Sequence, residues 1–251
     1  MNDSTAAIEK QQSAAALRRH LKAAKYLRQQ ANLEPAAARA RLSLREWQAG
    51  RLARSHRQLL GSPRFGPAAS FFISDLYGPK DFSCRDEEVE RILPLLIKML
   101  PASALRTLAL AVELDALTEE LDSAMVTELC RAGQIEHIDE AAYAAAYRAV
   151  ACRAARQHQI VLIRETGQAL DKLTKKPLLS SLLKMMRHPA QLAGLADLHQ
   201  FLDRGFNAFR GMGSASDFLD AIENKEQQVM SRLFDGVGDP FLIQAQPGNP
   251  H

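Results

Sequence analysis

Cysteine, proline, glycine and aromatic residues are all scarce in this sequence of 251 residues. It contains 3 Cys, 11 Pro and 13 Gly, and aromatic residues make up 6% of it. Glycine and proline are the residues least compatible with helix interiors, so their scarcity beside abundant Ala and Leu favours helix over sheet. No segment alternates apolar and polar residues as a half-buried strand does. We therefore predict an all-α fold, a single-domain multi-helix bundle of about eight or nine helices.

The three cysteines, Cys84, Cys130 and Cys152, lie far apart and include no Cys-x-x-Cys pair. An odd number of scattered cysteines predicts neither a zinc ribbon nor a disulfide framework, and it is typical of a protein in a reducing cytoplasm. No apolar run approaches the roughly 18 residues of a membrane span, and the N-terminus lacks the apolar core of a signal peptide. We expect a cytoplasmic protein with no membrane among its partners.

Motifs that indicate a known chemistry are missing as well. The sequence has no Glu-x-x-His, no HExxH, no phosphate-binding glycine loop and no Gly-x-Ser-x-Gly. It therefore predicts none of the di-iron, zinc-protease, nucleotide-binding or hydrolase classes that these motifs define. We predict no metal site. The cofactor is unknown, because a haem needs only one axial histidine and the seven histidines leave it open. Whether the protein is an enzyme is open too.

The net charge of +3 conceals a strong asymmetry along the chain. Residues 1–64 contain 13 Lys and Arg against 4 Asp and Glu, a balance of +9, whereas residues 65–251 contain 19 against 25, a balance of −6. We expect the basic front end to fold onto the acidic remainder. The alternative is a basic arm for nucleic acid or another acidic partner. Six arginines would carry that role, but they spread around a helix instead of forming one stripe, so we do not expect nucleic acid. They are Arg39, Arg41, Arg45, Arg51, Arg54 and Arg57.

The apolar pattern has a period of 3.6 almost throughout and divides the chain into three parts. These are residues 1–64, a basic N-terminal helical hairpin packed on the main body; residues 65–235, the main helical bundle; and residues 236–251, a flexible tail without a period. Helices are predicted over about 4–31, 35–60, 68–76, 83–100, 101–121 (or to 130), 140–173 and 214–234. Further helices are predicted to start at Pro177 and Pro189. Asp139 is the expected N-cap of the 140–173 helix.

Acidic residues lie in two narrow seams on the otherwise apolar helix that follows Pro101. The seams contain Glu113 and Glu120 on one side, and Asp115, Glu119 and Asp122 on the other. A carboxylate near a core must be paired, protonated or ligating. We expect these side chains to reach solvent or to meet arginines. The alternative is that Glu113 and Asp115 help to line a pocket.

The long 140–173 helix predicts a second polar line. Tyr147, His158 and Glu165 fall on one apolar, Ala-rich stripe when the helix is continuous. Histidine transfers protons near neutral pH and a glutamate can orient it. A lone His on such a stripe is more often a hydrogen-bonded core residue, so both interpretations are kept.

The helix at 35–60 carries the only Trp of the chain. Trp47, Arg51 and Arg54 share one side at spacings of four and seven, which would suit an exposed partner surface with cation–π contacts. The other expectation is that a neighbouring helix covers Trp47. Arg45 and His56 lie on the apolar face of the same helix.

The stretch FFISDLYGPKDFSCRDEEVE, residues 71–90, is the richest in polar detail. Asp75, Tyr77, Asp81 and Arg85 surround a Gly-Pro turn and a predicted helix start. We expect a structural corner in which Arg85 pairs with Asp75 or Asp81. The alternative, compatible with the first, is a pocket wall.

This stretch carries a resemblance, together with ELDALTEELD at 113–122 and GFNAFRGMGSASDFLDAIENKE at 205–226. The chain resembles a family of uncharacterised proteobacterial helical proteins with an FFxxDLYGPxDFSxRD motif. The resemblance implies an all-helical fold and no catalytic residues.

Two hypotheses follow, and the absence of a catalytic motif favours the first. The first is a non-catalytic module for a protein partner or for self-assembly into a homo-oligomer, which expects an exposed Trp47 and a core without a sizeable cavity. The second is a bundle with a buried small-molecule or cofactor pocket, with or without enzymatic activity. Nucleic-acid binding through the basic helices is a weaker third.

Overall fold

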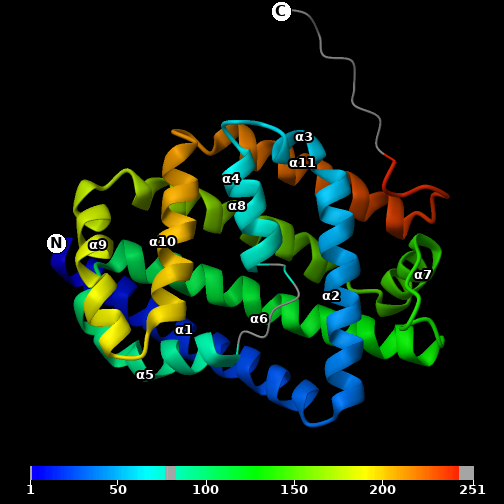
Figure 1. Cartoon of the computed structure of the whole chain (residues 1–251), viewed down its shortest axis with the longest axis horizontal. Coiled ribbons are helices and arrows are strands. Elements are labelled where there is room, and N and C mark those ends of the chain that lie inside the picture. Colours follow the sequence, from blue (N-terminus) through cyan, green and yellow to red (C-terminus); the bar gives the residue numbers. More distant parts are fainter. Residues whose placement is uncertain (1, 77, 79–82, 243–251) are drawn as a thin grey trace, which may run out of the picture.

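The computed structural model describes residues 2–76, 78 and 83–242, which form eleven α-helices, a π-helical turn and no strand (Figure 1). The all-α prediction is therefore confirmed. The helices are α1 (Asn2–Asn32), α2 (Pro35–Ser55), α3 (Arg57–Leu60), α4 (Gly66–Phe71), α5 (Ser83–Met99), α6 (Ala102–Arg131), α7 (Glu140–Val150), α8 (Arg153–Thr174), α9 (Pro177–Leu192), α10 (Ala196–Gly211) and α11 (Ser216–Phe234), with the π-turn η1 (Phe72–Leu76) after α4.

The long helix α6 runs through the middle of the bundle, and α1, α2, α7 and α8 all contact it (Figure 1). Its residues Leu105, Leu114, Leu121, Met125 and Leu129 are buried, as its two apolar faces predict. α11 packs on α8 and α7, and α10 packs on α9, α4 and α8. Helix α6 is therefore the element around which the other helices are placed.

Apolar packing is concentrated in three clusters. One joins α2, α6, α7, α8 and α11 around Tyr143 and Met125; one joins α4, α10 and α11 around Phe209 and Phe218; one joins α1, α5 and α6 around Leu105. In the second cluster a Cβ atom at Gly205 would lie 2.7 Å from Phe71 Cζ, so α10 needs glycine there for its close approach to α4.

Arginines of α1 and α2 converge on a glutamate of α6. Glu119 is 1% exposed and forms ion pairs with Arg28, Arg41 and Arg45. Arg28 pairs with Asp115 as well. Burial, followed by repulsion from Arg45, lowers the pKa of Arg41 to about 10, which still leaves it charged at neutral pH. The acidic seam of α6 thus meets arginines from the basic front end of the chain.

One predicted helix is broken at an unexpected position. The 140–173 segment divides into α7 and α8 at Ala151–Cys152, and not near Gly167. Ala151 has φ 55° and ψ 19°, the left-handed conformation that a residue with a side chain adopts at a cost. Gly167 lies inside α8, where an added Cβ would collide with Leu219 of α11. Asp139 caps α7 by accepting a hydrogen bond from Ala142 N at 2.7 Å, as predicted.

Other helix limits also differ from the predictions. The 35–60 helix is interrupted at His56, which explains in part why helices outnumber the eight or nine expected. Pro189 lies within α9 and starts no helix, and Pro94 lies within α5. The last helix begins at Ser216, two residues after the predicted Ser214, and Ala215 is its N-cap.

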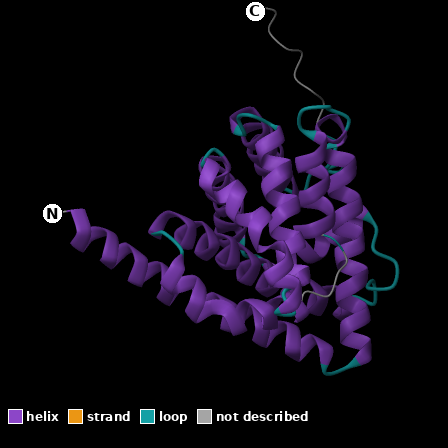
Figure 2. Cartoon of the chain, turned by 60° about the vertical axis from the view of Figure 1, so that its left-hand side comes forward, coloured by secondary structure: helices purple, strands orange, loops and turns teal. Residues whose placement is uncertain are grey.

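The first turns of α1 extend away from the body of the bundle (Figure 2). Residues 5–9 are exposed, whereas Leu17 and Ala24 further along are fully buried. At the other end of the chain Phe241 packs on Trp47, with ring centroids 5.8 Å apart. The rest of the predicted tail, residues 243–251, lies outside the described residues, and the division at 64 and 235 stays a prediction.

Candidate functional site

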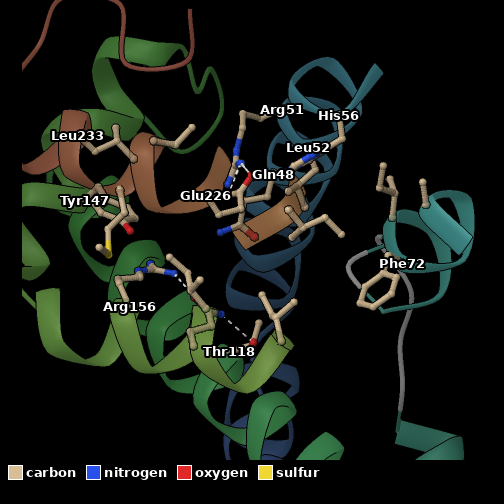
Figure 3. A pocket seen from close by; sticks show the side chains of 18 of the residues that line it. Gln48, Arg51, Leu52, His56, Phe72, Thr118, Tyr147, Arg156, Glu226 and Leu233 are labelled. Atoms are coloured by element: carbon tan, nitrogen blue, oxygen red, sulfur yellow. Dashed lines mark hydrogen bonds and ion pairs between the residues drawn. The ribbon is translucent and has the colours of Figure 1, made fainter. Parts of the chain in front are cut away.

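A cavity of about 100 Å³ lies between α2, α6, α7, α8 and α11, with η1 at one side (Figure 3). Most of its wall is apolar and includes Leu52, Phe72, Ile160, Phe218 and Leu233. These residues come from four separate segments, α2, η1, α8 and α11, so the cavity depends on the tertiary fold. Polar side chains enter it in three groups.

The first polar group joins α2, the turn after it, and α11. Arg51 Nη1 donates to both carboxylate oxygens of Glu226, at 2.8 and 2.7 Å, and His56 Nε2 lies 2.8 Å from Oε1. Burial alone would raise the pKa of Glu226, but Arg51 and His56 outweigh it and lower the pKa to about 2. Burial likewise opposes the charge of Arg51, and Glu226 outweighs it, so the Arg51 pKa is raised. Both groups are therefore ionised, and their charges are paired.

The second group links α2 to α6. Gln48 Nε2 donates to Asp122 Oδ1 at 3.0 Å, and Arg45 Nε lies 4.0 Å from Asp122 Oδ2. Asp122 is 2% exposed. Through Arg45 this side of the cavity is continuous with the ion pairs around Glu119.

The third group contains Arg156, a buried cation that forms no ion pair within the described residues. Gln159 of α8 donates to Thr118 Oγ1 of α6 at 2.9 Å, and Arg156 Nη1 donates to Gln159 Oε1 at 3.2 Å. Arg156 Cζ lies 4.7 Å from the centroid of the Tyr147 ring. Arg156 is 7% exposed, and its Nη2 is buried without a hydrogen-bond partner. Figure 3 shows its guanidinium extending from α8 toward the middle of the cavity.

Tyr147 and its neighbours close the cavity from α7. Burial raises the pKa of the Tyr147 hydroxyl, so it stays protonated at neutral pH. Tyr143 stacks on Trp47, with centroids 4.1 Å apart. The left-handed Ala151 turns the chain between α7 and α8, and this corner brings Tyr147 over Arg156.

A family model described as Domain of unknown function (DUF8198) matches residues 27–240. The chain belongs to this family. The match takes in every helix that lines the cavity. It supports the resemblance to an uncharacterised family and assigns no activity. No curated protein and no solved structure matches the chain.

Of the three polar residues predicted to share one stripe of the 140–173 helix, only Tyr147 lines the cavity. His158 has a side chain 53% exposed and lies 3.4 Å from Glu113, and Glu165 is exposed on α8. The reason is the break at Ala151, because it changes the rotation of α8 relative to α7. The prediction treated residues 140–173 as one continuous helix, and these side chains share one stripe only in such a helix.

The other predicted pocket residues lie elsewhere. Glu113 faces His158 on the surface, and Asp115 pairs with Arg28. Asp75 is buried and accepts a hydrogen bond from Arg204 at 2.7 Å. Tyr77, Asp81 and Arg85 fall outside the residues whose side chains the structure describes.

The predicted partner surface is divided. Trp47 is half-buried under Phe241 and against Tyr143, and Arg51 is 9% exposed in the cavity wall. Arg54 alone is exposed, at 55% of its side chain, with Glu140 3.8 Å away. Trp47, Arg51 and Arg54 thus do not form one exposed surface.

Three of the main cavity residues were not singled out from the sequence as site residues: Arg156, Gln159 and Glu226. The pattern did contain a signal for Arg156, which precedes the cavity residues Ile160 and Ile163 by four and seven positions and so shares their apolar face. His56 was placed on the apolar face of its helix, and it lines the cavity. Glu226 ends the third stretch that carries the family resemblance.

No helix in the described part of the chain is both long and apolar enough to cross a bilayer. Within the same residues, no three His, Cys, Asp or Glu side chains are grouped closely enough to hold a metal ion.

Proposed function

We propose that the protein binds a small organic molecule in the cavity between α2, α6, α7, α8 and α11. The observation that carries this proposal is the cavity itself, which combines an apolar wall with a few convergent polar groups. An engineered cavity of about 150 Å³ binds benzene, which has six heavy atoms, so about 100 Å³ suits a ligand of roughly four to six heavy atoms.

The competing hypothesis of an interaction module expects an exposed Trp47 and a core without a sizeable cavity. Trp47 instead packs between Tyr143 and Phe241, and a cavity is present. The basic-arm hypothesis loses support for a similar reason, because Arg41, Arg45 and Arg51 are engaged with carboxylates inside the bundle. The cavity hypothesis is therefore the best supported.

The proposal includes a location. Cys130 and Cys152 are exposed and free, which suits a reducing compartment. We place the protein in the cytoplasm and, following the family resemblance, in a bacterium.

The decisive experiment enlarges one side chain that lines the cavity and, as a control, a neighbouring side chain that does not. Ala69 lines the cavity, whereas its neighbour Ala68 is fully buried and does not. Ala69→Leu should be nearly neutral in stability because the new side chain enters empty space. Ala68→Leu should cost about 1–3 kcal/mol through overpacking.

Binding is then measured with neutral and carboxylate fragments of about four to six heavy atoms. Methyl NMR of Ile160, in the cavity wall, should shift with bound fragments, while exposed Ile8 should not. Ala69→Leu should abolish the Ile160 shifts. The proposal is overturned if no fragment shifts Ile160, or if binding persists in Ala69→Leu.

A further inference from the structure

One buried charge of the bundle lacks a counter-charge among the described residues. The other buried arginines, Arg28, Arg41 and Arg51, each form an ion pair with a carboxylate. The buried carboxylates Asp75, Glu119 and Asp122 each lie within 4.0 Å of an arginine. Arg156 is the exception.

The ion pairs of the other arginines are as follows. Arg28 pairs with Asp115 and Glu119, Arg41 with Glu119, Arg45 with Glu119 and Asp122, and Arg51 with Glu226. Within the part of the chain that the structure describes, Arg156 forms no ion pair, and its hydrogen bond goes to the neutral amide of Gln159. An isolated buried charge is costly, and a cation–π contact with Tyr147 offsets only part of that cost.

The position of Arg156 indicates what would balance it. Its unpartnered Nη2 is buried in the wall of the cavity, and nine-tenths of the side chain is shielded from solvent. The two carboxylates of the cavity wall are already engaged: Glu226 accepts two bonds from Arg51 and one contact from His56, and Asp122 accepts a bond from Gln48. A guanidinium presents donors that suit a carboxylate.

We propose that the ligand of this cavity is a small monocarboxylate whose carboxylate pairs with Arg156 and whose apolar tail contacts Ile160 and Leu233. The proposal rests on the function proposed above. A single negative charge matches the one guanidinium of the cavity wall that has no ion pair within the described residues, and the apolar wall favours a short carbon chain over an inorganic ion. The size of the cavity limits that chain to a few carbons.

Butyrate and butyramide test the proposal, because they share a shape and differ in charge. Dissociation constants are measured by titrating the Ile160 methyl signal of the full chain, in wild type and in Arg156→Gln. Wild type should bind butyrate about 10- to 100-fold more tightly than butyramide, the usual effect of a charge-assisted hydrogen bond. Arg156→Gln should lose that advantage while its affinity for butyramide changes less than about twofold.

Stability without ligand gives a second readout. If Arg156 is held for a ligand, removing its charge should raise the melting temperature of the ligand-free protein. If Arg156 serves only to pack on Tyr147 and Gln159, Arg156→Gln should lower the melting temperature and leave the butyrate preference intact, which would overturn the proposal.

The remaining outcomes separate this inference from the proposed function. Butyramide binding as tightly as butyrate would preserve the ligand cavity and overturn the carboxylate. Formate or chloride binding as tightly as butyrate would identify a site for inorganic or tailless anions and overturn the apolar tail. If no compound shifts Ile160, both proposals fail.

Discussion

The ion pairs around Glu119 make the most direct prediction about stability. Glu119→Gln keeps the size of the side chain and removes the one charge that three arginines share. Arg28 would keep Asp115, and Arg45 would keep Asp122 at 4.0 Å. Arg41, 7% exposed, has no other ion pair within the described residues and would become a buried unpaired cation.

Breaking a buried ion pair by removing one partner costs about 3–5 kcal/mol. For a chain of this size each kcal/mol lowers the melting temperature by about 2–4 °C, so we expect a fall of roughly 6–20 °C. The assay is urea unfolding followed by the fluorescence of Trp47, the only tryptophan, which is stacked on Tyr143 and reports on the same end of the bundle. The matched control is Glu120→Gln, the exposed neighbour on α6, which should change stability by less than about 0.5 kcal/mol.

A double variant tests the cause. If the unpaired Arg41 is the source of the loss, adding Arg41→Met to Glu119→Gln should recover part of it, because contacting residues are commonly coupled by about 0.5–3 kcal/mol. A loss below about 1 kcal/mol for Glu119→Gln would show that the pairs do not hold α2 to α6. Strictly additive losses in the double variant would refute the role given to Arg41.

Three further predictions concern the cavity and its frame. Because the pKa of Glu226 is lowered to about 2 from 4.5, its ionisation stabilises the fold fully above pH 4.5. In urea unfolding, the difference in unfolding free energy between wild type and Glu226→Gln should shrink by up to about 3 kcal/mol as the pH falls to 2. A difference that does not depend on pH would contradict the lowered pKa. Ala151→Gly should raise the stability of the protein to thermal unfolding by up to about 1 kcal/mol, because glycine adopts the left-handed conformation without the strain of a side chain. Ala145→Gly, at an exposed position within α7, should lower it by about 1 kcal/mol. Gly205→Ala should destabilise through its clash with the ring packed against it, while Gly211→Ala, in open space at the end of the same helix, should be neutral or slightly stabilising; equal effects would show that α10 does not need its close approach.

Local pattern was sufficient for most of the helices. The apolar period of α6 and the cap at Asp139 follow from residues near one another in the sequence. The acidic seam of α6 is visible in the same way, but its arginine partners lie far from it in the sequence. Charge asymmetry between the two ends of the chain gave the correct expectation that carboxylates of α6 would meet arginines.

The cavity was beyond such reasoning for two physical reasons. The break between α7 and α8 occurs at an alanine, with no Gly or Pro to mark it, because tertiary packing overrides the local preference for helix. Without that break Tyr147 and His158 seem to share a face, and the real neighbour of Tyr147 is Arg156. The pairing of Arg51 with Glu226 spans 175 residues, and no local period relates two positions so far apart.

The shared carboxylate of α6 also has a consequence for the order in which the chain acquires its structure during synthesis. Glu119 follows Arg28 by 91 residues. At translation rates of about 5–20 residues per second, the ribosome takes roughly 5–18 seconds to supply the partner of an arginine it has already released. During that interval the first two helices have neither their counter-charges nor the surface of α6 to pack on. Helices α1 and α2 are therefore synthesised well before α6, the helix that completes their packing. Their arginines remain hydrated until the residues of α6 have emerged.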